Sequence, residues 1–271
     1  GACRYGVYGK SPLTGGFGGS DAGGYFGPGI RNQGVEALVI SGASEDPVYL
    51  WVEDGDVKVM DATYLWGLET GPAFEKLKAE HGRISTILIG PAGENLVRYA
   101  CIVNDLHHVN GRTGMGAVMG SKKIKAVVVP YPKALEPSDK DLLKAMQEEF
   151  SGWKEEPLSW NLHVHGTSAG VGANNKDGLL PTRNFQRSAF EGAASIDGKL
   201  MTETLLKDRY GCFACAVRCK RIVEGGKYNT DPAYGGPEYE TLGALGSVCC
   251  IDDLDAVTKG HEVCNRLGLD T

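Results

Sequence analysis

The chain lacks the features that would place it in several large classes of protein. No apolar run among its 271 residues approaches the roughly 18 residues of a membrane-spanning helix, no segment resembles a secretory leader, and we find no internal repeat. The formal net charge of −6 argues against a nucleic-acid surface, which normally carries clustered basic residues. We therefore expect a soluble, cytoplasmic protein that has no membrane span and binds no nucleic acid.

The cysteines also lack the spacing of common structural sites. Zinc sites usually combine two C-x2-C pairs, or one pair with two histidines, and no second pair is present. Three cysteines instead form a C-x2-C-x3-C array of Cys212, Cys215 and Cys219, the reverse of the order used by radical-SAM enzymes. Thiolates at this spacing can reach three corners of a cuboidal iron–sulfur cluster and leave the fourth to a distant ligand. The array predicts a 4Fe-4S cluster, with zinc as the alternative.

A disulfide framework is possible because the total of eight cysteines is even. However, Cys249 and Cys250 are adjacent, and the chain is far larger than disulfide-dependent scaffolds. A reducing compartment fits better. We interpret the remaining cysteines as ordinary thiols; they are Cys3, Cys101, Cys249, Cys250 and Cys264.

Glycine is abundant, with 39 residues, and is densest before residue 35. Glycine permits positive φ angles and lets backbone N–H groups approach a ligand closely. The glycine-rich segment therefore predicts either a loop that binds a ligand through its backbone or a set of tight turns between strands.

Hydrophobic patterning divides the chain near residue 134. Short apolar runs before that point predict strands at 37–40, 48–51, 57–60, 86–89 and 126–129, with one helix at 71–81. Beyond it we predict three helices. The first begins at Ser138, the second covers 202–209, and the third runs from about Asp252 to Leu267. We therefore predict an α+β fold, with a β-rich domain at residues 1–134 and a mainly helical domain at 135–271 that carries the cluster cysteines.

Several motifs occur in the same order as in a known family. They are Arg4-Tyr5, Lys10–Gly15, Gly23–Gly27, Gly90–Asn95, Gly111–Lys122, the cysteine array, Gly236–Glu240 and Leu267–Asp270. With these motifs the chain closely resembles the tungsten-dependent aldehyde:ferredoxin oxidoreductases along nearly its whole length. Members of that family are considerably longer. The resemblance therefore implies a missing N-terminal segment and a missing C-terminal portion that holds the fourth cluster cysteine and a histidine near the metal.

The resemblance implies tungsten held by two pterins on the N-terminal β domain, close to a 4Fe-4S cluster. Arg4 would link pterin and cluster, because a guanidinium offers several fixed donors to anionic acceptors. The backbone at Gly23 and Gly24 would meet pterin and phosphate. A magnesium ion bridging the phosphates would bind Asp21, where the family has asparagine, and the carbonyl of Val109.

Further roles are implied around these positions. Arg112, His107 and His108 would contact phosphate, with Arg112 the preferred residue and a solvent-facing pair as the alternative for the two histidines. The pterin signature Asp-x-x-Gly-Leu-Asp is represented by Asn265, Gly268, Leu269 and Asp270, in which an amide replaces the first acid.

Glu240 corresponds to the acid that the family places near the metal for proton transfer. A structural helix N-terminal acid is the alternative, and Glu238 would serve that role equally well. Arg218 and Lys220 either face a reduced cluster or are solvated.

The predicted function is oxidation of aldehydes to carboxylic acids, with electrons passed through the cluster to ferredoxin or an iron–sulfur subunit, in a possible homo- or hetero-oligomer. Two alternatives stay open. One is a related tungstopterin enzyme acting on another carbonyl compound or an aromatic thioester. The other is a non-catalytic iron–sulfur or zinc-binding module.

Overall fold

A computed structural model describes residues 3–134 and 136–271. Gly1, Ala2 and Leu135, which the predicted domain limits include, lie outside the described residues. The chain divides into two compact units. Unit 1 comprises Gly1–Lys133, Cys212–Ala214 and Val263–Thr271, and unit 2 comprises Ala134–Gly211 and Cys215–Glu262. The chain therefore leaves unit 1 after Lys133 and returns to it twice.

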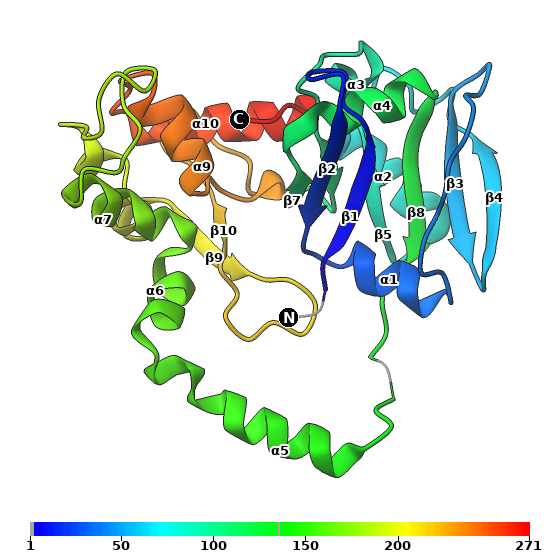
Figure 1. The fold of residues 1–271 in the computed structure, drawn as a ribbon, viewed down its shortest axis with the longest axis horizontal. Coiled ribbons are helices and arrows are strands. Elements are labelled where there is room, and N and C mark those ends of the chain that lie inside the picture. The colour runs from blue at the N-terminus through cyan, green and yellow to red at the C-terminus, as the bar shows by residue number, and fades with distance from the viewer. Residues whose placement is uncertain (1–2, 135) are drawn as a thin grey trace. The chain divides into compact units, whose positions relative to one another are not determined.

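A six-stranded mixed sheet forms the centre of unit 1 (Figure 1). Its order is β4 (Asp56–Asp61), β3 (Val48–Glu53), β8 (Ile124–Pro130), β5 (Ile84–Leu88), β6 (Ile102–Asn104) and β7 (His108–Asn110). Only the β3–β8 pair is parallel. The strands predicted at 48–51, 57–60, 86–89 and 126–129 are confirmed.

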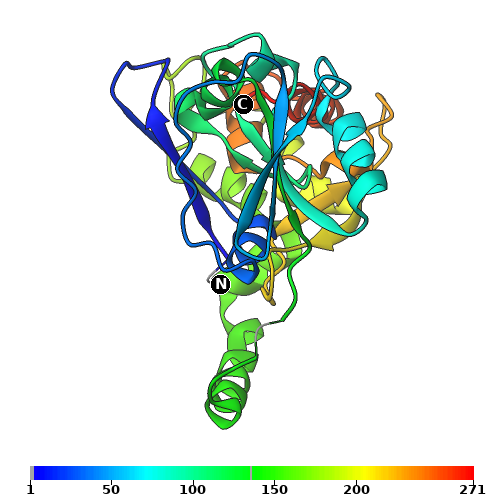
Figure 2. The same cartoon turned by 90° about the vertical axis from the view of Figure 1, so that its right-hand side faces the viewer.

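Side-chain alternation gives the sheet two apolar faces. Val127 and Val129 of β8 pack with Phe26 of α1 (Phe26–Asn32) and Met115 of α4 (Met115–Ser121). Val128, on the opposite face, packs in the cluster that contains Ala73 and Leu77 of α2 (Thr70–His81). Figure 2 shows α2, in cyan, on one side of the sheet and α1, in blue, near its lower end. The helix predicted at 71–81 is confirmed.

The glycine-rich N-terminal segment forms a separate antiparallel ribbon. β1 (Tyr5–Lys10) pairs with β2 (Phe17–Ala22), so that Tyr5 lies opposite Ala22. Tyr5 packs edge-on against Phe26, with ring centroids 5.0 Å apart. Unit 1 also contains α3 (Pro91–Glu94) and η1 (Arg112–Gly114).

Unit 2 is mainly helical. Its elements are α5 (Lys140–Phe150), η2 (Ser151–Glu155), α6 (Pro157–His165), η3 (Thr167–Ala169), α7 (Gly170–Lys176), η4 (Ala193–Ser195), α8 (Gly198–Thr204), β9 (Leu206–Tyr210), β10 (Lys220–Val223), η5 (Pro232–Tyr234), α9 (Tyr239–Thr241) and the π-helix η6 (Leu242–Ser247). A core of its own includes Leu180, Ile196, Met201 and Leu242. Among the residues that the structure describes, every helix is too short or too polar to cross a bilayer.

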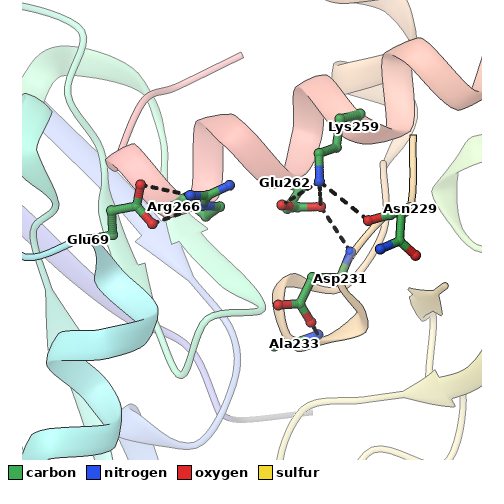
Figure 3. A network of polar contacts seen from close by, with 7 residues as sticks. All are labelled: Glu69, Asn229, Asp231, Ala233, Lys259, Glu262 and Arg266. Carbon is green, nitrogen blue, oxygen red and sulfur yellow. Dashed lines mark hydrogen bonds and ion pairs between the residues drawn. The ribbon is translucent and has the colours of Figure 1, made fainter. Parts of the chain in front are cut away.

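The last helix, α10 (Leu254–Leu267), contributes residues to both units. It ends as predicted, with Gly268 at a φ angle of +75°. Within unit 1, Arg266 forms two 2.9 Å bonds with the carboxylate of Glu69 (Figure 3). Within unit 2, the buried carboxylate of Glu262 accepts a bond from Lys259 at 2.7 Å and from the backbone N–H of Asp231 at 2.9 Å.

Two predictions about elements were wrong. Residues 37–40 form no strand, because the segment has no partner in a sheet; the side chain of Val39 is 91% exposed. The helix expected at 202–209 ends at Thr204, and β9 takes the following residues because they pair with β10. The helix predicted to begin at Ser138 is confirmed as α5; its cap is Asp139, one residue later, whose carboxylate accepts a 2.8 Å bond from Leu142 N–H.

Candidate functional site

The hairpin formed by β6 and β7 is linked to the N-terminal ribbon by a polar network. Asn110 donates to the carbonyl of Ser20 at 2.8 Å and accepts from the hydroxyl of Tyr5 at 2.7 Å. That hydroxyl accepts from Asn104, 3.3 Å away, and Asn104 also lies 3.4 Å from the carbonyl of Gly23. Burial raises the pKa of Tyr5 far above its ordinary value, so its hydroxyl stays a donor. The network holds the glycine turn against the hairpin.

Close contacts disfavour a larger residue than glycine at this turn. A Cβ on Gly24 would lie 2.8 Å from Asn104 Oδ1, and the φ angle of +98° also disfavours other residues. A Cβ on Gly23 would lie 2.6 Å from Cys212 Sγ. Asn104 Oδ1 is buried and accepts no hydrogen bond from the described residues. None of the sequence patterns had identified Asn104, because its partners lie far away in the chain.

The C-terminal segment of unit 1 joins the base of the same hairpin. The N–H of Cys101 donates to the carbonyl of Gly268 at 2.9 Å, and Ala100 forms a bridge with Leu269. Asp270 N–H donates to the carbonyl of Tyr99 at 3.2 Å. These contacts hold the predicted pterin signature beside the start of β6.

Two more contacts bring this signature close to the turn of the hairpin and to the residue that follows β7. The buried amide of Asn265 donates to the carbonyl of Leu106 at 3.4 Å. A Cβ on Gly111 would lie 2.5 Å from Asp270 Oδ1. Three of the predicted cofactor segments, 23–24, 109–112 and 265–270, therefore meet around one hairpin.

The turn of the hairpin is strained and pinned to β5. Asp105 and Leu106 have φ angles of +46° and +62°. The carboxylate of Asp105 accepts from Ser85 Oγ at 2.6 Å and from Thr86 N–H at 2.7 Å. Burial raises the pKa of Asp105 to about 7, although these two bonds oppose the shift. The carboxylate thus fixes the turn that precedes β7.

The predicted phosphate and magnesium residues of unit 1 differ in their exposure to solvent. Asp21 is exposed, and one of its oxygens accepts a 3.1 Å bond from Tyr8, which raises the pKa of that phenol. Its second carboxylate oxygen can still bind a cation. Arg4 and Arg112 are exposed and Val109 is half-buried in β7. His108 is only 4% exposed, so the solvent-facing alternative does not hold for that residue.

These residues fit an anionic, multi-ring ligand such as a pterin with its phosphates. The backbone at Gly23 and Gly24 is bare of side chains, a buried amide oxygen has capacity for a donor, and two exposed guanidiniums suit phosphate. The roles of the individual residues stay predictions.

The cysteine array occupies the connection between β9 and β10. Cys212 belongs to unit 1, where the next residue, Phe213, donates its N–H to the carbonyl of Gly24 at 3.2 Å. Burial, and then the neighbouring Cys212, raise the pKa of Cys3. Cys215 and Cys219 belong to unit 2.

The three array thiols are partly buried, and no disulfide joins any of the eight cysteines, all of which lie among the described residues. Across residues 3–134 and 136–271, no three side chains of metal-binding type lie close enough to hold an ion. Within unit 2, Cys219 lies close to the buried Arg221, and thiolates near a cation suit an anionic cluster. Sequence reasoning did not identify Arg221.

Glu240 lies in the first turn of α9 and is exposed in unit 2. The π-helix η6 follows directly, an uncommon geometry often found at functional sites. Glu238 precedes the helix and pairs with Lys220, with Oε1 and Nζ 2.5 Å apart. Glu238 is therefore half-buried beside a cation, and the side chain of Glu240 is exposed.

Comparisons with known proteins cover almost the whole chain. Residues 1–131 match the model of the aldehyde ferredoxin oxidoreductase N-terminal domain, and residues 143–271 match that of aldehyde ferredoxin oxidoreductase domains 2 and 3. The tungsten-containing aldehyde ferredoxin oxidoreductases of Thermococcus kodakarensis and Pyrococcus furiosus are 40% and 37% identical over 99% of this chain. The chain spans 44% of the length of each.

A more distant relative and a solved structure extend the comparison. The aliphatic sulfonate oxidoreductase WOR-like subunit of Pyrococcus furiosus is 30% identical over 97% of this chain and 45% of its own length. The active-site complex BamBC of benzoyl coenzyme A reductase, solved with 1,5-dienoyl-CoA, superimposes with a TM-score of 0.75 and 25% identity. The match covers 99% of this chain and 43% of that one. From these matches, the chain belongs to the aldehyde ferredoxin oxidoreductase family.

Proposed function

We propose that the chain is part of a tungstopterin oxidoreductase that oxidises aldehydes to carboxylic acids and passes the electrons through a 4Fe-4S cluster to ferredoxin or an iron–sulfur subunit. The observation that best supports this proposal is that segments 23–24, 109–112 and 265–270 lie close together around the β6–β7 hairpin. The names of its curated relatives support this function. A cytoplasmic location is part of the proposal.

In unit 1, each cofactor residue has a role suited to its chemistry. The backbone at Gly23 and Gly24 admits the pterin edge and phosphates, and Arg112 binds phosphate through its planar donors. Asp21 and the Val109 carbonyl supply hard oxygen ligands for magnesium. Arg4 donates to pterin and cluster.

The signature residues serve the pterin ring. Asn265 and Asp270 offer amide and carboxylate groups to ring N–H and carbonyl positions, while the backbone of Gly268 and Leu269 holds them beside the hairpin. When bound, the tungsten centre supplies the two-electron chemistry that aldehyde oxidation requires. The chain's residues position the cofactor and handle protons.

Glu240 is the proposed proton-transfer group, and Cys212, Cys215 and Cys219 are the proposed cluster ligands. An exposed carboxylate on the first turn of α9 can exchange a proton with water or substrate at its Oε atoms. Glu240→Gln should keep tungsten and cluster but lose most turnover. Glu238→Gln is the matched control, because Glu238 is held by Lys220. Near-normal turnover in Glu240→Gln would reject the assignment.

Elemental analysis and pterin fluorescence on anaerobically purified native protein test the cofactor proposal. We expect tungsten, iron and pterin together. Metal-loaded cysteines without tungsten or pterin would instead support the non-catalytic module.

A second candidate keeps the cofactor but acts on an aromatic thioester. It is favoured by the similarity to the benzoyl coenzyme A reductase complex, which extends over 99% of this chain. Parallel assays with aldehydes and an aryl-CoA thioester separate the candidates, since turnover of the thioester alone would reject aldehyde oxidation.

A further inference from the structure

Arg221 is a buried cation whose charge is not neutralised. Its side chain is 2% exposed. Nη1 donates to the carbonyls of His163 and Val164 at 2.8 and 2.6 Å, and Nη2 donates to that of Arg218 at 2.7 Å. Nε is buried without a partner among the described residues. Carbonyls satisfy N–H groups but leave the full positive charge in place, which is costly inside a protein.

Two more arginines surround this cation. The β9–β10 ladder, whose strands are seen side by side in Figure 1, places Arg209 directly opposite Arg221. The guanidinium of Arg218 donates to the carbonyl of Arg209. Like charges opposite each other weaken a strand pair. In the part of the chain that the structure describes, none of the three pairs with a carboxylate.

The cation lies beside the last cysteine of the array. A Cβ on Gly166 would lie 2.8 Å from the carbonyl oxygen of Cys219 and 3.2 Å from Nε of Arg221. Burial chiefly lowers the pKa of this arginine, to about 10, and a thiolate at Cys219 opposes that shift. The unpaired N–H and the backbone of Cys219 are therefore neighbours within unit 2.

We propose that Arg221 is the charge-compensating residue of an anionic centre held by the cysteine loop, and that it raises the reduction potential of that centre. The inference rests on the proposed 4Fe-4S cluster. One-electron reduction adds one negative charge to the cluster and changes no bond of the protein. A nearby buried cation favours the more negative state.

A purely structural role makes a different prediction. Arg221 binds carbonyls in the last turn of α6, where a cation also interacts favourably with the helix dipole. If that were its whole contribution, substitution would reduce stability without changing the potential of the cluster.

An EPR-monitored redox titration of the anaerobically purified native protein, with dithionite as reductant, separates the two roles. In Arg221→Gln, the ratio of reduced to oxidised cluster at the wild-type midpoint should fall about tenfold, a shift of about 59 mV to lower potential for one electron. Arg221→Lys keeps the charge and should stay near the wild type. Arg218→Gln removes an exposed charge next to Cys219 and should shift the potential much less, because water screens it.

Each outcome decides the matter. An unchanged potential in Arg221→Gln with an intact cluster signal overturns the proposed role of Arg221 and leaves the cluster proposal standing. If Arg221→Gln lacks the cluster, retention in Arg221→Lys supports the charge, whereas loss in both variants shows that only the carbonyl bonds matter. A wild-type protein without an iron–sulfur signal overturns the cluster proposal and, with it, this one.

Discussion

At the scale of single residues, the space around a glycine decides how much stability is lost when alanine replaces it. Gly24 and Gly34 both have positive φ angles, but a Cβ on Gly24 would press on Asn104, whereas a Cβ on Gly34 would meet nothing within 4 Å. Gly34→Ala should therefore cost about 1 kcal/mol, for the backbone alone. Gly24→Ala should cost about 2–3 kcal/mol, because it adds steric overlap.

Urea unfolding of both variants measures the difference, and pterin content shows whether the turn has moved. Equal costs would mean that the contact with Asn104 yields easily and that Gly24 is needed only for its φ angle.

Asp105 makes the stability of unit 1 depend on pH. Its folded-state pKa of about 7 lies above the roughly 3.9 of an unfolded chain, so the folded protein binds this proton more tightly. The resulting stabilisation is complete below about pH 4 and is lost as the pH rises through about 7. Its slope is at most about 1.4 kcal/mol per pH unit.

Comparing the unfolding free energies of the wild type and Asp105→Asn between about pH 5 and 7 isolates the contribution of Asp105 to the pH dependence of stability. The variant should have the shallower decline with pH. Parallel curves would show that Asp105 is already ionised throughout this range.

Local spacing determines which residues could be predicted. The cysteine array and the glycine motifs are short, so sequence reasoning finds them directly. Asn104 and Arg221 escape it because burial and remote partners, not spacing, distinguish them. The roles of Glu240 and Arg4 stay predictions.

At the scale of elements, a buried ion pair joins α3 to the central sheet. The side chains of Lys125 in β8 and Glu94 in α3 are 0% and 4% exposed, and they form an ion pair. Lys125 also donates to the carbonyl of Leu68, and Glu94 accepts from the N–H of Gly67, each at 2.8 Å. Burial lowers the pKa of Lys125. The pair therefore fixes the loop that leads into α2.

Replacing one member of this pair should lower the free energy of unfolding more than replacing both. Lys125→Met leaves the carboxylate of Glu94 buried and unpaired, at about 3–5 kcal/mol. Adding Glu94→Gln should recover part of that loss, and a double-mutant cycle from chemical unfolding measures the coupling. Simple additivity of the two changes would contradict the ion pair.

The elements that could be predicted are those whose pattern and packing agree. β3 and β8 alternate apolar side chains toward two covered faces, as their sequences indicate. Residues 37–40 are equally apolar, yet no neighbouring strand is available to pair with them. Residues 206–210 suit a helix or a strand, and only pairing with β10 decides between them.

At the scale of the whole molecule, unit 1 depends on contacts between distant parts of the chain. Gly268 has a φ angle of +75°, and a Cβ there would lie 2.8 Å from the N atom of Gly90. Gly268→Ala should therefore loosen the bond from Cys101 N–H to the carbonyl of residue 268 and speed amide exchange at residues 99–101.

Hydrogen-exchange mass spectrometry detects this change. Gly225→Ala in unit 2 is the control, because its φ angle of +80° is similar and a Cβ there would meet nothing within 4 Å. Unchanged protection of residues 99–101 in Gly268→Ala would show that the C-terminal segment does not stabilise β6.

The division of unit 1 has a consequence for biosynthesis. Thr70 bonds to the carbonyl of a residue 195 positions later, at Asn265. A ribosome adding about 5–20 residues per second therefore exposes the sheet for many seconds before its last segment emerges. During that interval residues 99–101, just before β6, would lack the hydrogen-bond partners that Gly268–Asp270 later supply.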